Sequence, residues 1–298
     1  MNNTRNIGSD LGFAILRTMI GIFYFIPIKL LYVLVPPCKF VLESISRYRK
    51  RVIKANLINS LPNYDHISIN ETISNYYEHL AEVTIENLKL FSNKHLDKIK
   101  FEITNPRLLD NLYKEKRDVI MLSGHLGNWE IGFAAASQKY KHKVIGIYKK
   151  QTNEKADKYL LQKRLERGVT LIEQSQFSKM ILTKSKNPRL FMLIPDQNPS
   201  HNKRNIKINF LNQRTVFNTA IERIAVKNDI PVVYGDIAKL TRGHYRATML
   251  WITESPTRTE PHYITKQYAK LLERNIISNP SIWLWSHRRW KPDKEESA

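Results

Sequence analysis

Residues 119–137 read V-I-M-L-S-G-H-L-G-N-W-E-I-G-F-A-A-A-S, and this stretch decides the fold of the chain around it. Its first four residues are apolar and β-prone and end at a Ser-Gly turn, which predicts a short buried strand. Trp129, Phe133 and Ala136 then recur at helical spacing, and Asn128 is suited to cap the N-terminus of that helix. A strand that leads through a tight turn into a helix is typical of an α/β fold.

This unit places His125 in the turn and Glu130 in the first turn of the helix. Residues five apart on a continuous helix point about 140° apart, so the two side chains meet only if His125 lies outside the helix. Gly124 and Gly127 give the backbone the freedom to bend in that way. A histidine held by a carboxylate at one ring nitrogen presents the other nitrogen as a base. Such a base can take a proton from a hydroxyl or amine that attacks an activated acyl carbon.

The segment G-H-L-G-N-W-E at 124–130 resembles the acyl-transfer motif H-x-x-x-x-D/E of the lipid A biosynthesis acyltransferases of the lauroyl/myristoyl type. These enzymes fall within the larger lysophospholipid acyltransferase-like superfamily. Outside this context, a histidine near a glutamate is more often a polar pair with a structural role alone. The resemblance implies that His125 and Glu130 are catalytic, that an acyl thioester is the co-substrate, and that no cofactor is needed.

The resemblance covers about residues 50–291 in four ordered blocks. N-L-I-N-S-L-P at 56–62 is similar to an N-L-x-x-x-x-P segment near the start of family members. I-K-I-N-F-L-N-Q-R-T-V-F at 206–217 stands where the family has F-F-G-x-x-A/V-x-T. Asn212 replaces the glycine there, and asparagine also tolerates left-handed geometry. N-P-S-I-W-L-W-S-H-R-R-W-K at 279–291 matches nearly every position of the family's closing segment, P-x-x-[WY]-x-W-x-H-R-R-[WF]-K.

Candidate substrate contacts follow a second predicted strand. Tyr148 and Lys149 come at the end of the strand predicted over 143–148, where the family usually has Tyr-Arg-Pro. Lys149 replaces the arginine, and a lysine lacks the planar fork of a bidentate anion clamp. Arg164 lies on a basic helix predicted over 152–167 and resembles a family arginine, which implies a contact with a phosphate or carboxyl group. The alternative is a helix charge that faces solvent.

Asp196 lies near the end of the run L-F-M-L-I-P-D-Q-N at 190–198, which predicts a buried strand ending in Asp-Gln and is the third block of the resemblance. Open α/β sheets place ligand contacts at the ends of strands, so we expect Asp196 either to orient the acceptor or to support the His125 loop. Simple capping of a turn is the alternative. Asn128 is a further candidate substrate contact, because two backbone N–H groups around residues 124–128 are expected to stabilise an oxyanion.

The chain carries a large positive charge. Its 298 residues include 48 Lys and Arg against 27 Asp and Glu, which gives a net charge of +21 and a pI near 9.9. This excess points to anionic lipid headgroups, nucleic acid or an acidic carrier protein, although a lysine-rich genome would account for part of it. The three tryptophans among basic residues at 279–291 suit a membrane interface or stacking on nucleic acid. The single cysteine, Cys38, excludes an intramolecular disulfide, which fits a cytosol-facing protein.

Residues 11–35 form the membrane candidate of the sequence. The length reaches the ~20 residues that a span needs, but Arg17 and Lys29 interrupt the segment and Pro27 would kink it. A single span, an interfacial helix and a buried helical hairpin remain as alternatives, with a membrane anchor or interfacial helix favoured. The basic run S-R-Y-R-K-R-V-I-K at 46–54 is typical of the cytoplasmic side of a membrane and of contact with anionic lipids, unless it is simply a solvated helix face.

The predicted fold is α/β, with a mixed central sheet flanked by helices, similar to the glycerolipid acyltransferases. It is preceded by an N-terminal helical segment that associates with a membrane. We expect an anchor or interfacial segment over 1–45, an acyltransferase domain over 46–291 and a disordered tail over 292–298. The resemblance further implies that a helix predicted over 67–91 helps to form an acyl-chain groove.

The predicted function is transfer of a fatty acyl chain from an acyl thioester to a hydroxyl of a lipid A precursor. His125 would be the general base and Glu130 its orienting carboxylate. The expected partners are acyl-carrier protein or acyl-CoA as donor, a lipid acceptor and the membrane surface at the cytoplasmic face of the bacterial inner membrane, with no nucleic acid. One alternative keeps the chemistry and changes the acceptor to another glycolipid, an aminolipid or a pigment lipid. The other is a non-catalytic basic protein that binds membranes or nucleic acid.

Overall fold

The computed structural model describes most of the chain, with side chains from Asp10 onward. The described ranges are 2–92, 99–148, 150, 153–183, 185–199 and 205–290. Two predictions, the contact by Lys149 and the disordered tail at 292–298, lie outside the described residues.

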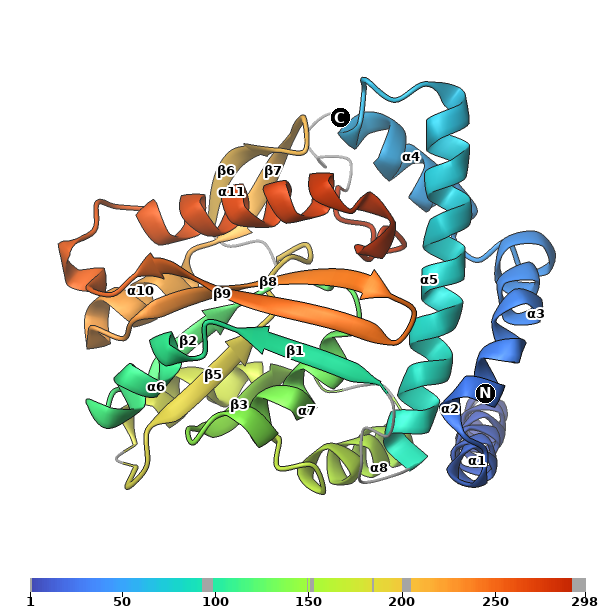
Figure 1. Ribbon diagram of the computed structural model, residues 1–298, viewed down its shortest axis with the longest axis horizontal. Helices are drawn as coiled ribbons and strands as arrows, with labels where there is room; N and C mark the ends of the chain where they lie inside the picture. The colour runs from blue at the N-terminus through green and yellow to red at the C-terminus, as the bar shows by residue number, and fades with distance from the viewer. Residues whose placement is uncertain are drawn as a thin grey trace.

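Seven strands form one sheet in the order β1-β9-β8-β2-β5-β3-β4 (Figure 1). Their bounds are β1 (Lys100–Thr104), β2 (Val119–Leu122), β3 (Lys143–Tyr148), β4 (Thr170–Glu173), β5 (Arg189–Leu193), β8 (Val232–Thr241) and β9 (His244–Thr253). Strands β8, β2, β5, β3 and β4 run parallel to one another, whereas β9 is antiparallel to β8 and parallel to β1. The predicted mixed sheet is therefore confirmed.

The two central strands, β2 and β5, are buried along their whole length. Parallel strands covered on both faces are apolar throughout, which explains the runs V-I-M-L and L-F-M-L in the sequence. Helices α7 (Trp129–Lys139) and α8 (Glu154–Leu165) lie on one side of the sheet, and α11 (Tyr263–Ser278) lies on the other (Figure 1). The remaining helices of this part of the chain are α6 (Arg107–Lys114), α9 (Phe177–Leu182) and α10 (Ala220–Asn228).

A separate hairpin joins β6 (Asn205–Phe210) to β7 (Gln213–Asn218). Asn212, in the two-residue turn, has a φ of +59°. Asparagine adopts this left-handed conformation more readily than most residues, so the turn is kept even though the glycine expected from the family resemblance is replaced.

Helix α5 (His66–Ser92) stands at one end of the sheet and follows α4 (Lys50–Ser60) (Figure 1). Three N-terminal helices, α1 (Asn2–Phe25), α2 (Ile28–Leu31) and α3 (Val35–Phe40), pack on the outer side of α5. Pro27 lies between α1 and α2, where its missing N–H and its ring end a helix. Buried apolar residues of these helices, among them Ile20, Leu31 and Val35, form a cluster with Ala81 and Ile85 of α5.

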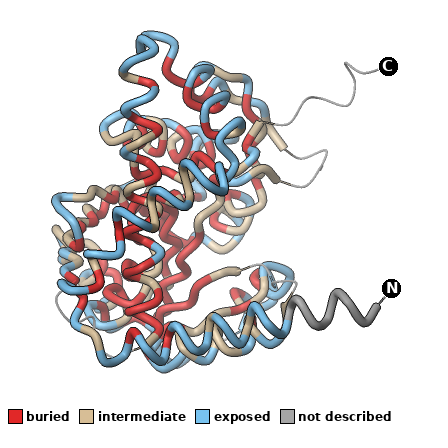
Figure 2. The backbone as a smooth tube through the Cα atoms, turned by 90° about the vertical axis from the view of Figure 1, so that its right-hand side faces the viewer, coloured by how far each residue is buried: buried red, intermediate tan, exposed pale blue. Residues whose placement is uncertain are grey.

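The outer side of the N-terminal helices exposes many apolar side chains. In Figure 2, which looks onto this side, α1 is mostly exposed in the part whose burial is described, from Asp10 onward. We define the N-terminal apolar surface by its exposed members Leu11, Ile15, Met19, Ile22, Tyr24, Phe25, Leu30, Val33, Leu34, Phe40, Val41 and Ile45. None of the helices in the described ranges is long and apolar enough to cross a membrane.

Candidate active site

His125 and Asp196 meet because their strands are neighbours in the sheet. Each residue lies three positions after the end of its strand, β2 for His125 and β5 for Asp196. The two strands pair in parallel, from Val119 opposite Leu190 onward, so their carboxyl ends reach the same edge of the sheet. Open α/β sheets place their ligand contacts at this edge.

Three hydrogen bonds hold the Asp196 carboxylate, which is 2% exposed. Its Oδ1 lies 2.5 Å from Nδ1 of His125, and its Oδ2 accepts from the backbone N–H of His125 at 2.8 Å. The indole N–H of Trp283 also donates to Oδ2, at 2.8 Å. A carboxylate that accepts at Nδ1 favours the tautomer with the proton on Nδ1, which leaves Nε2 with a lone pair.

The charge of Asp196 is maintained by these neighbours. Burial alone raises the pKa of a carboxyl, but the nearby His125 and the hydrogen bonds from His125 and Trp283 outweigh it, so the pKa of Asp196 is lowered from its ordinary value. The His125 side chain is about one-fifth exposed, at 18%, and its Nε2 lies 3.4 Å from Nε2 of Gln197. The outer ring nitrogen is therefore within reach of a substrate at the surface.

Glu130 does not hold the His125 ring as we predicted, because the ring is held by Asp196. Its carboxylate accepts two hydrogen bonds from Arg164 of α8, at 2.9 Å from Nε and 2.5 Å from Nη2. The ring of Trp129 packs edge-on against His125, with 4.9 Å between ring centroids. Successive helical residues point about 100° apart, so with Trp129 facing His125 the Glu130 side chain is directed toward α8.

Arg164 is thus engaged with a carboxyl group of the protein itself. Burial lowers its pKa, but the hydrogen bonds and the charge of Glu130 outweigh that effect, and the pKa of Arg164 is raised overall. The guanidinium also lies over the ring of Phe91, 5.5 Å from its centroid. A bidentate pair of this kind joins α7 to α8 beside the His125 loop.

The predicted cap of α7 by Asn128 is confirmed, but the Asn128 side chain is not available to bind a substrate. Its Oδ1 accepts from the backbone N–H of Ile131 at 3.2 Å, and its Nδ2 donates to Oε2 of Glu86 at 2.9 Å. The residue is fully buried. The expected substrate contact by the Asn128 side chain is therefore replaced by a structural role, since both ends of its amide are already hydrogen-bonded inside the protein.

Tyr148 lies at the end of β3, on the same edge of the sheet as His125. Its hydroxyl is 3.5 Å from Oδ2 of Asp157 in α8, which is the outer limit of a hydrogen bond. The structure shows no contact between Tyr148 and His125. Its predicted role in substrate binding stays a prediction.

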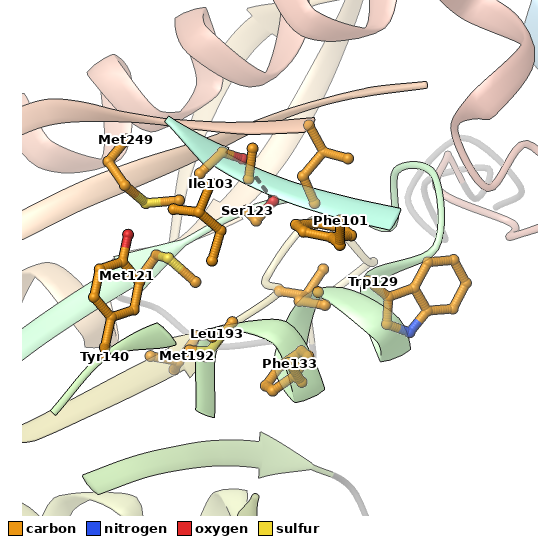
Figure 3. Close-up of a pocket in the computed structure, with 16 residues that line it drawn as sticks. Phe101, Ile103, Met121, Ser123, Trp129, Phe133, Tyr140, Met192, Leu193 and Met249 are labelled. Atoms are coloured by element: carbon orange, nitrogen blue, oxygen red, sulfur yellow. Dashed lines mark hydrogen bonds between the residues drawn. The ribbon is translucent and has the colours of Figure 1, made fainter. Parts of the chain in front are cut away.

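An apolar cavity lies between α7 and the sheet (Figure 3), and one of its lining residues, Trp129, packs against His125. It encloses about 450 Å³, including the part open to solvent. Trp129, at the start of α7, and Tyr140, just after its end, lie toward opposite ends of it (Figure 3), and the 11 residues of α7 rise about 16 Å. It is lined by Phe101, Ile103, Met121, Ser123, Trp129, Gly132, Phe133, Ala136, Tyr140, Met192, Leu193, Ile194, Gly235, Ile237, Ala247 and Met249.

The sequence did not reveal this cavity. Its lining comes from α7 and from the strands β1, β2, β5, β8 and β9 together with the residues that follow β2 and β5. We expected the helix over 67–91 to contribute to a groove, but within the described part of the chain no residue of α5 lines this cavity. The apolar residues of the strands had the pattern of an ordinary core, and nothing in their spacing indicated an opening.

The family comparison agrees with this geometry. The sequence model described as "Bacterial lipid A biosynthesis acyltransferase" matches residues 7–292. The chain belongs to this family. It is accordingly an acyltransferase enzyme of lipid A biosynthesis, which confirms the resemblance seen in the sequence. A search of the curated proteins gave no match.

The closing segment of this acyltransferase completes the site. Trp283 pairs with Leu126 in a β-bridge, and the N–H of Leu284 donates to the His125 carbonyl at 3.1 Å. Trp283 and Trp285 are buried, with Trp283 bonded to Asp196. The suggestion that the three tryptophans suit a membrane interface or nucleic acid is therefore wrong for these two, because they pack inside the protein and support the His125 loop.

The groups of the site are suited to acid–base chemistry on a substrate with a long apolar chain. His125 offers an outer nitrogen that can accept a proton, and Asp196 can stabilise the imidazolium that results. Within the parts of the chain that the structure describes, no group of three or more His, Cys, Asp or Glu side chains is arranged to hold a metal ion.

Proposed function

We propose that this acyltransferase moves a fatty acyl chain from an acyl thioester to a hydroxyl of a lipid A precursor, with His125 as the general base. The observation that supports this best is the His125–Asp196 pair, because His125 packs against Trp129 and Trp129 lines the apolar cavity. We place the acyl chain in this cavity and its carbonyl beside His125. The family supplies the class of reaction and of lipid product.

In the proposed reaction, Nε2 of His125 takes the proton of the acceptor hydroxyl as its oxygen attacks the thioester carbonyl carbon. A tetrahedral oxyanion forms, the carbon–sulfur bond then breaks, and the imidazolium returns the proton to the leaving sulfur. Asp196, hydrogen-bonded at Nδ1, stabilises the positive ring between these steps. No covalent acyl-enzyme is needed.

The oxyanion donors are narrowed by the backbone hydrogen bonds of the loop. The N–H groups of His125, Leu126 and Gly127 donate to Asp196, to the Gly124 carbonyl and to the Ile282 carbonyl. We infer that the donors are the N–H groups of Trp129 and Glu130 at the start of α7, because the N–H of Ile131 already donates to Asn128. The N–H groups at the start of a helix have no intrahelical acceptor and form the positive end of the helix dipole.

The cavity along α7 is the proposed acyl-chain site. A saturated chain advances about 1.25 Å per carbon, given C–C bonds of ~1.5 Å at ~111°. The ~16 Å between Trp129 and Tyr140 therefore takes roughly a dozen methylene groups. The depth of this cavity would decide which acyl chains are accepted.

Met249 tests this assignment, because Figure 3 places it with Tyr140 at the end far from Trp129. Met249→Ala deepens the cavity, so the ratio of kcat/KM for a 16-carbon over a 12-carbon acyl thioester should rise by about tenfold or more. Met180→Ala, the same change at a half-buried methionine outside the cavity, should leave the ratio unchanged. An unchanged ratio for Met249→Ala would place the acyl chain elsewhere.

We propose acyl-carrier protein as the donor. The net charge of +21 complements the acidic surface of such a carrier. Acyl-CoA is the alternative, and both thioesters can be compared in one assay at matched concentration. The reaction should be faster with the carrier protein, and the difference should shrink as salt is raised.

The function is tested by incubating the purified protein with isotopically labelled acyl-carrier-protein thioester and bacterial membranes, followed by mass spectrometry of the lipids. The expected result is a lipid A precursor heavier by one labelled acyl chain. Label on another glycolipid or on an aminolipid would keep the chemistry and replace the acceptor. Label on no lipid would reject the proposal.

We propose that the N-terminal apolar surface lies in the cytoplasmic face of the bacterial inner membrane. Phe25 is 81% exposed and Val33 is 71% exposed, and so large an exposed apolar surface is typical of a contact with lipid or protein. The basic run at 46–54 follows this surface and would meet anionic headgroups. An amphipathic surface of this kind binds at the interface without spanning the bilayer.

Membrane binding can be tested by replacing three residues of the N-terminal apolar surface with serine. The variant Phe25→Ser/Leu30→Ser/Val33→Ser should bind anionic vesicles about 100-fold more weakly, if each side chain contributes ~1 kcal/mol of apolar transfer. A control variant carries the same change at three exposed apolar residues outside the N-terminal apolar surface, Leu165, Leu182 and Ile277. Equal loss in both variants, measured by vesicle sedimentation, would contradict the proposed membrane face.

A further inference from the structure

Glu86 of α5 is a buried carboxylate outside the acid–base pair. It is fully buried and accepts three side-chain hydrogen bonds. Tyr32 Oη donates to Oε1 at 2.9 Å, while Asn128 Nδ2 and Tyr245 Oη donate to Oε2 at 2.9 and 2.8 Å. The three hydrogen bonds lower the pKa of Glu86, but burial and the nearby Glu82 outweigh them, so this pKa is raised from its ordinary value. Three elements far apart in the sequence thus meet at one side chain.

The first link runs from Glu86 to the His125 loop. Oε2 of Glu86 accepts from the Asn128 amide and so holds the amide nitrogen toward Glu86. The amide oxygen is then directed to the N–H of Ile131, which it caps at 3.2 Å. Asn128 lies three residues after His125 and begins α7, whose first turn carries the proposed oxyanion donors. The orientation of this cap therefore depends on Glu86.

The second link runs from Glu86 to the N-terminal helices. Tyr32 belongs to the short turn of helix between α2 and α3, and its hydroxyl is bonded to Glu86. One turn further along α5, the buried Lys89 donates from Nζ to the carbonyls of Phe23 and Tyr24, at 3.1 and 3.2 Å. These carbonyls end α1, where a positive charge is favourable. Both contacts attach the N-terminal helices to α5 through polar groups inside the protein.

We propose that Glu86 is a positioning residue that joins the N-terminal helices to the His125 loop, so that these helices support the catalytic geometry as well as the membrane contact. The inference rests on the proposed acyl transfer for its kinetic readout. Glu86 touches no substrate in this account. It acts through Asn128 on the start of α7, and Tyr32 acts through Glu86.

The first test changes one hydrogen bond at constant shape. Asn128→Asp removes the donor to Oε2 of Glu86 and places two carboxyl groups together. We expect kcat to fall by about tenfold, the effect of losing a helix cap at the active site, with KM for the acyl thioester changed less than about twofold. Glu86→Gln alone should change kcat less than about twofold, because the glutamine oxygen can take the place of Oε2, which has two donors, and its NH₂ group can donate to the Tyr32 hydroxyl.

The double variant Glu86→Gln/Asn128→Asp restores a donor and an acceptor. The new carboxylate accepts from the amide of residue 86 and from the N–H of Ile131 together, so kcat should return to within about threefold of the wild type. Without the proposed link, the double variant should be as slow as Asn128→Asp alone. That result, or an unchanged kcat in Asn128→Asp, would overturn the proposal.

Tyr32→Phe tests the second link, because it removes the hydroxyl and keeps the ring. In detergent micelles, without a bilayer, kcat should fall severalfold, as it should in vesicles. Tyr64→Phe, at an exposed tyrosine after α4, is the matched control and should leave kcat unchanged. A loss for Tyr32→Phe in vesicles alone would mean that the N-terminal helices act only through membrane attachment, and would overturn this link.

Hydrogen exchange separates this inference from the proposed function, because it needs no turnover. Amides over 129–135 should exchange at least tenfold faster in Asn128→Asp and return toward the wild-type rate in the double variant. This pattern in a protein that transfers no acyl chain would retain the positioning role and reject only the function. Unchanged exchange in Asn128→Asp would reject the positioning role whatever the activity.

Discussion

Replacing His125 by alanine is expected to lower kcat for acyl transfer by about 10³-fold, since a positioned general base contributes ~10²–10⁴-fold. KM for the acyl thioester should change little, because the chain is bound by the cavity along α7 rather than by the imidazole. The measurement is the rate of label transfer from the acyl thioester to lipid. His66→Ala, at an exposed histidine at the start of α5, is the control and should keep full activity.

The fold should survive this change. The His125 ring is partly exposed and donates to one carboxylate, so the variant should unfold within a few degrees of the wild type. Full acyl transfer by a folded His125→Ala protein would show that His125 is not the general base. A loss of activity together with a loss of folding would be resolved by His125→Gln, which can still donate to Asp196 but is no base.

The second large effect is expected for Asp196→Asn, with a fall in kcat of roughly 10³–10⁴-fold, as when the orienting carboxylate of a catalytic histidine is replaced. Oδ2 of Asp196 accepts from two donors, the N–H of His125 and the indole of Trp283. The asparagine oxygen should therefore take that place and turn its NH₂ group toward Nδ1. Nδ1 then becomes the acceptor and the proton moves to Nε2, which can no longer act as the base.

Glu130→Gln is the matched comparison for this prediction. It replaces the carboxylate that is nearest to His125 in the H-x-x-x-x-E motif by the same amide, but Glu130 binds Arg164 and not His125. Any loss of activity should come through the position of α8 and be smaller than the loss in Asp196→Asn. A larger fall in kcat for Glu130→Gln than for Asp196→Asn, together with a move of the His125 proton to Nε2 in Glu130→Gln, would contradict the assignment of Asp196.

The local structure around His125 could be predicted from the sequence because it depends on neighbours in the chain. The apolar strand, the turn and the cap by Asn128 each rest on patterns a few residues long. The partner of His125 could not be assigned in this way. Asp196 lies 71 residues away, and its approach depends on β2 and β5 being adjacent in the sheet, which no local pattern encodes.

The error at Glu130 has a simple physical origin. The spacing along the chain identified Glu130 as an acid that could reach His125. In the structure Trp129 occupies the side of α7 that faces His125, and the next residue, Glu130, points elsewhere. Trp283 was likewise missed, since its bond to Asp196 joins residues 87 apart. Its sequence context of basic residues suggested an interface, whereas the structure uses it as a buried donor. The cavity could not be predicted, because the apolar residues that line it have the sequence pattern of an ordinary hydrophobic core.

The proposed role of His125 as general base depends most on which of its two ring nitrogens carries the proton. ¹⁵N NMR of the histidine-labelled protein, at a pH where the ring is neutral, reports this directly. We predict a protonated Nδ1 and an unprotonated Nε2, retained in Glu130→Gln and reversed in Asp196→Asn. A wild-type protein with its proton on Nε2 would contradict the pairing with Asp196 and with it the base proposed for acyl transfer.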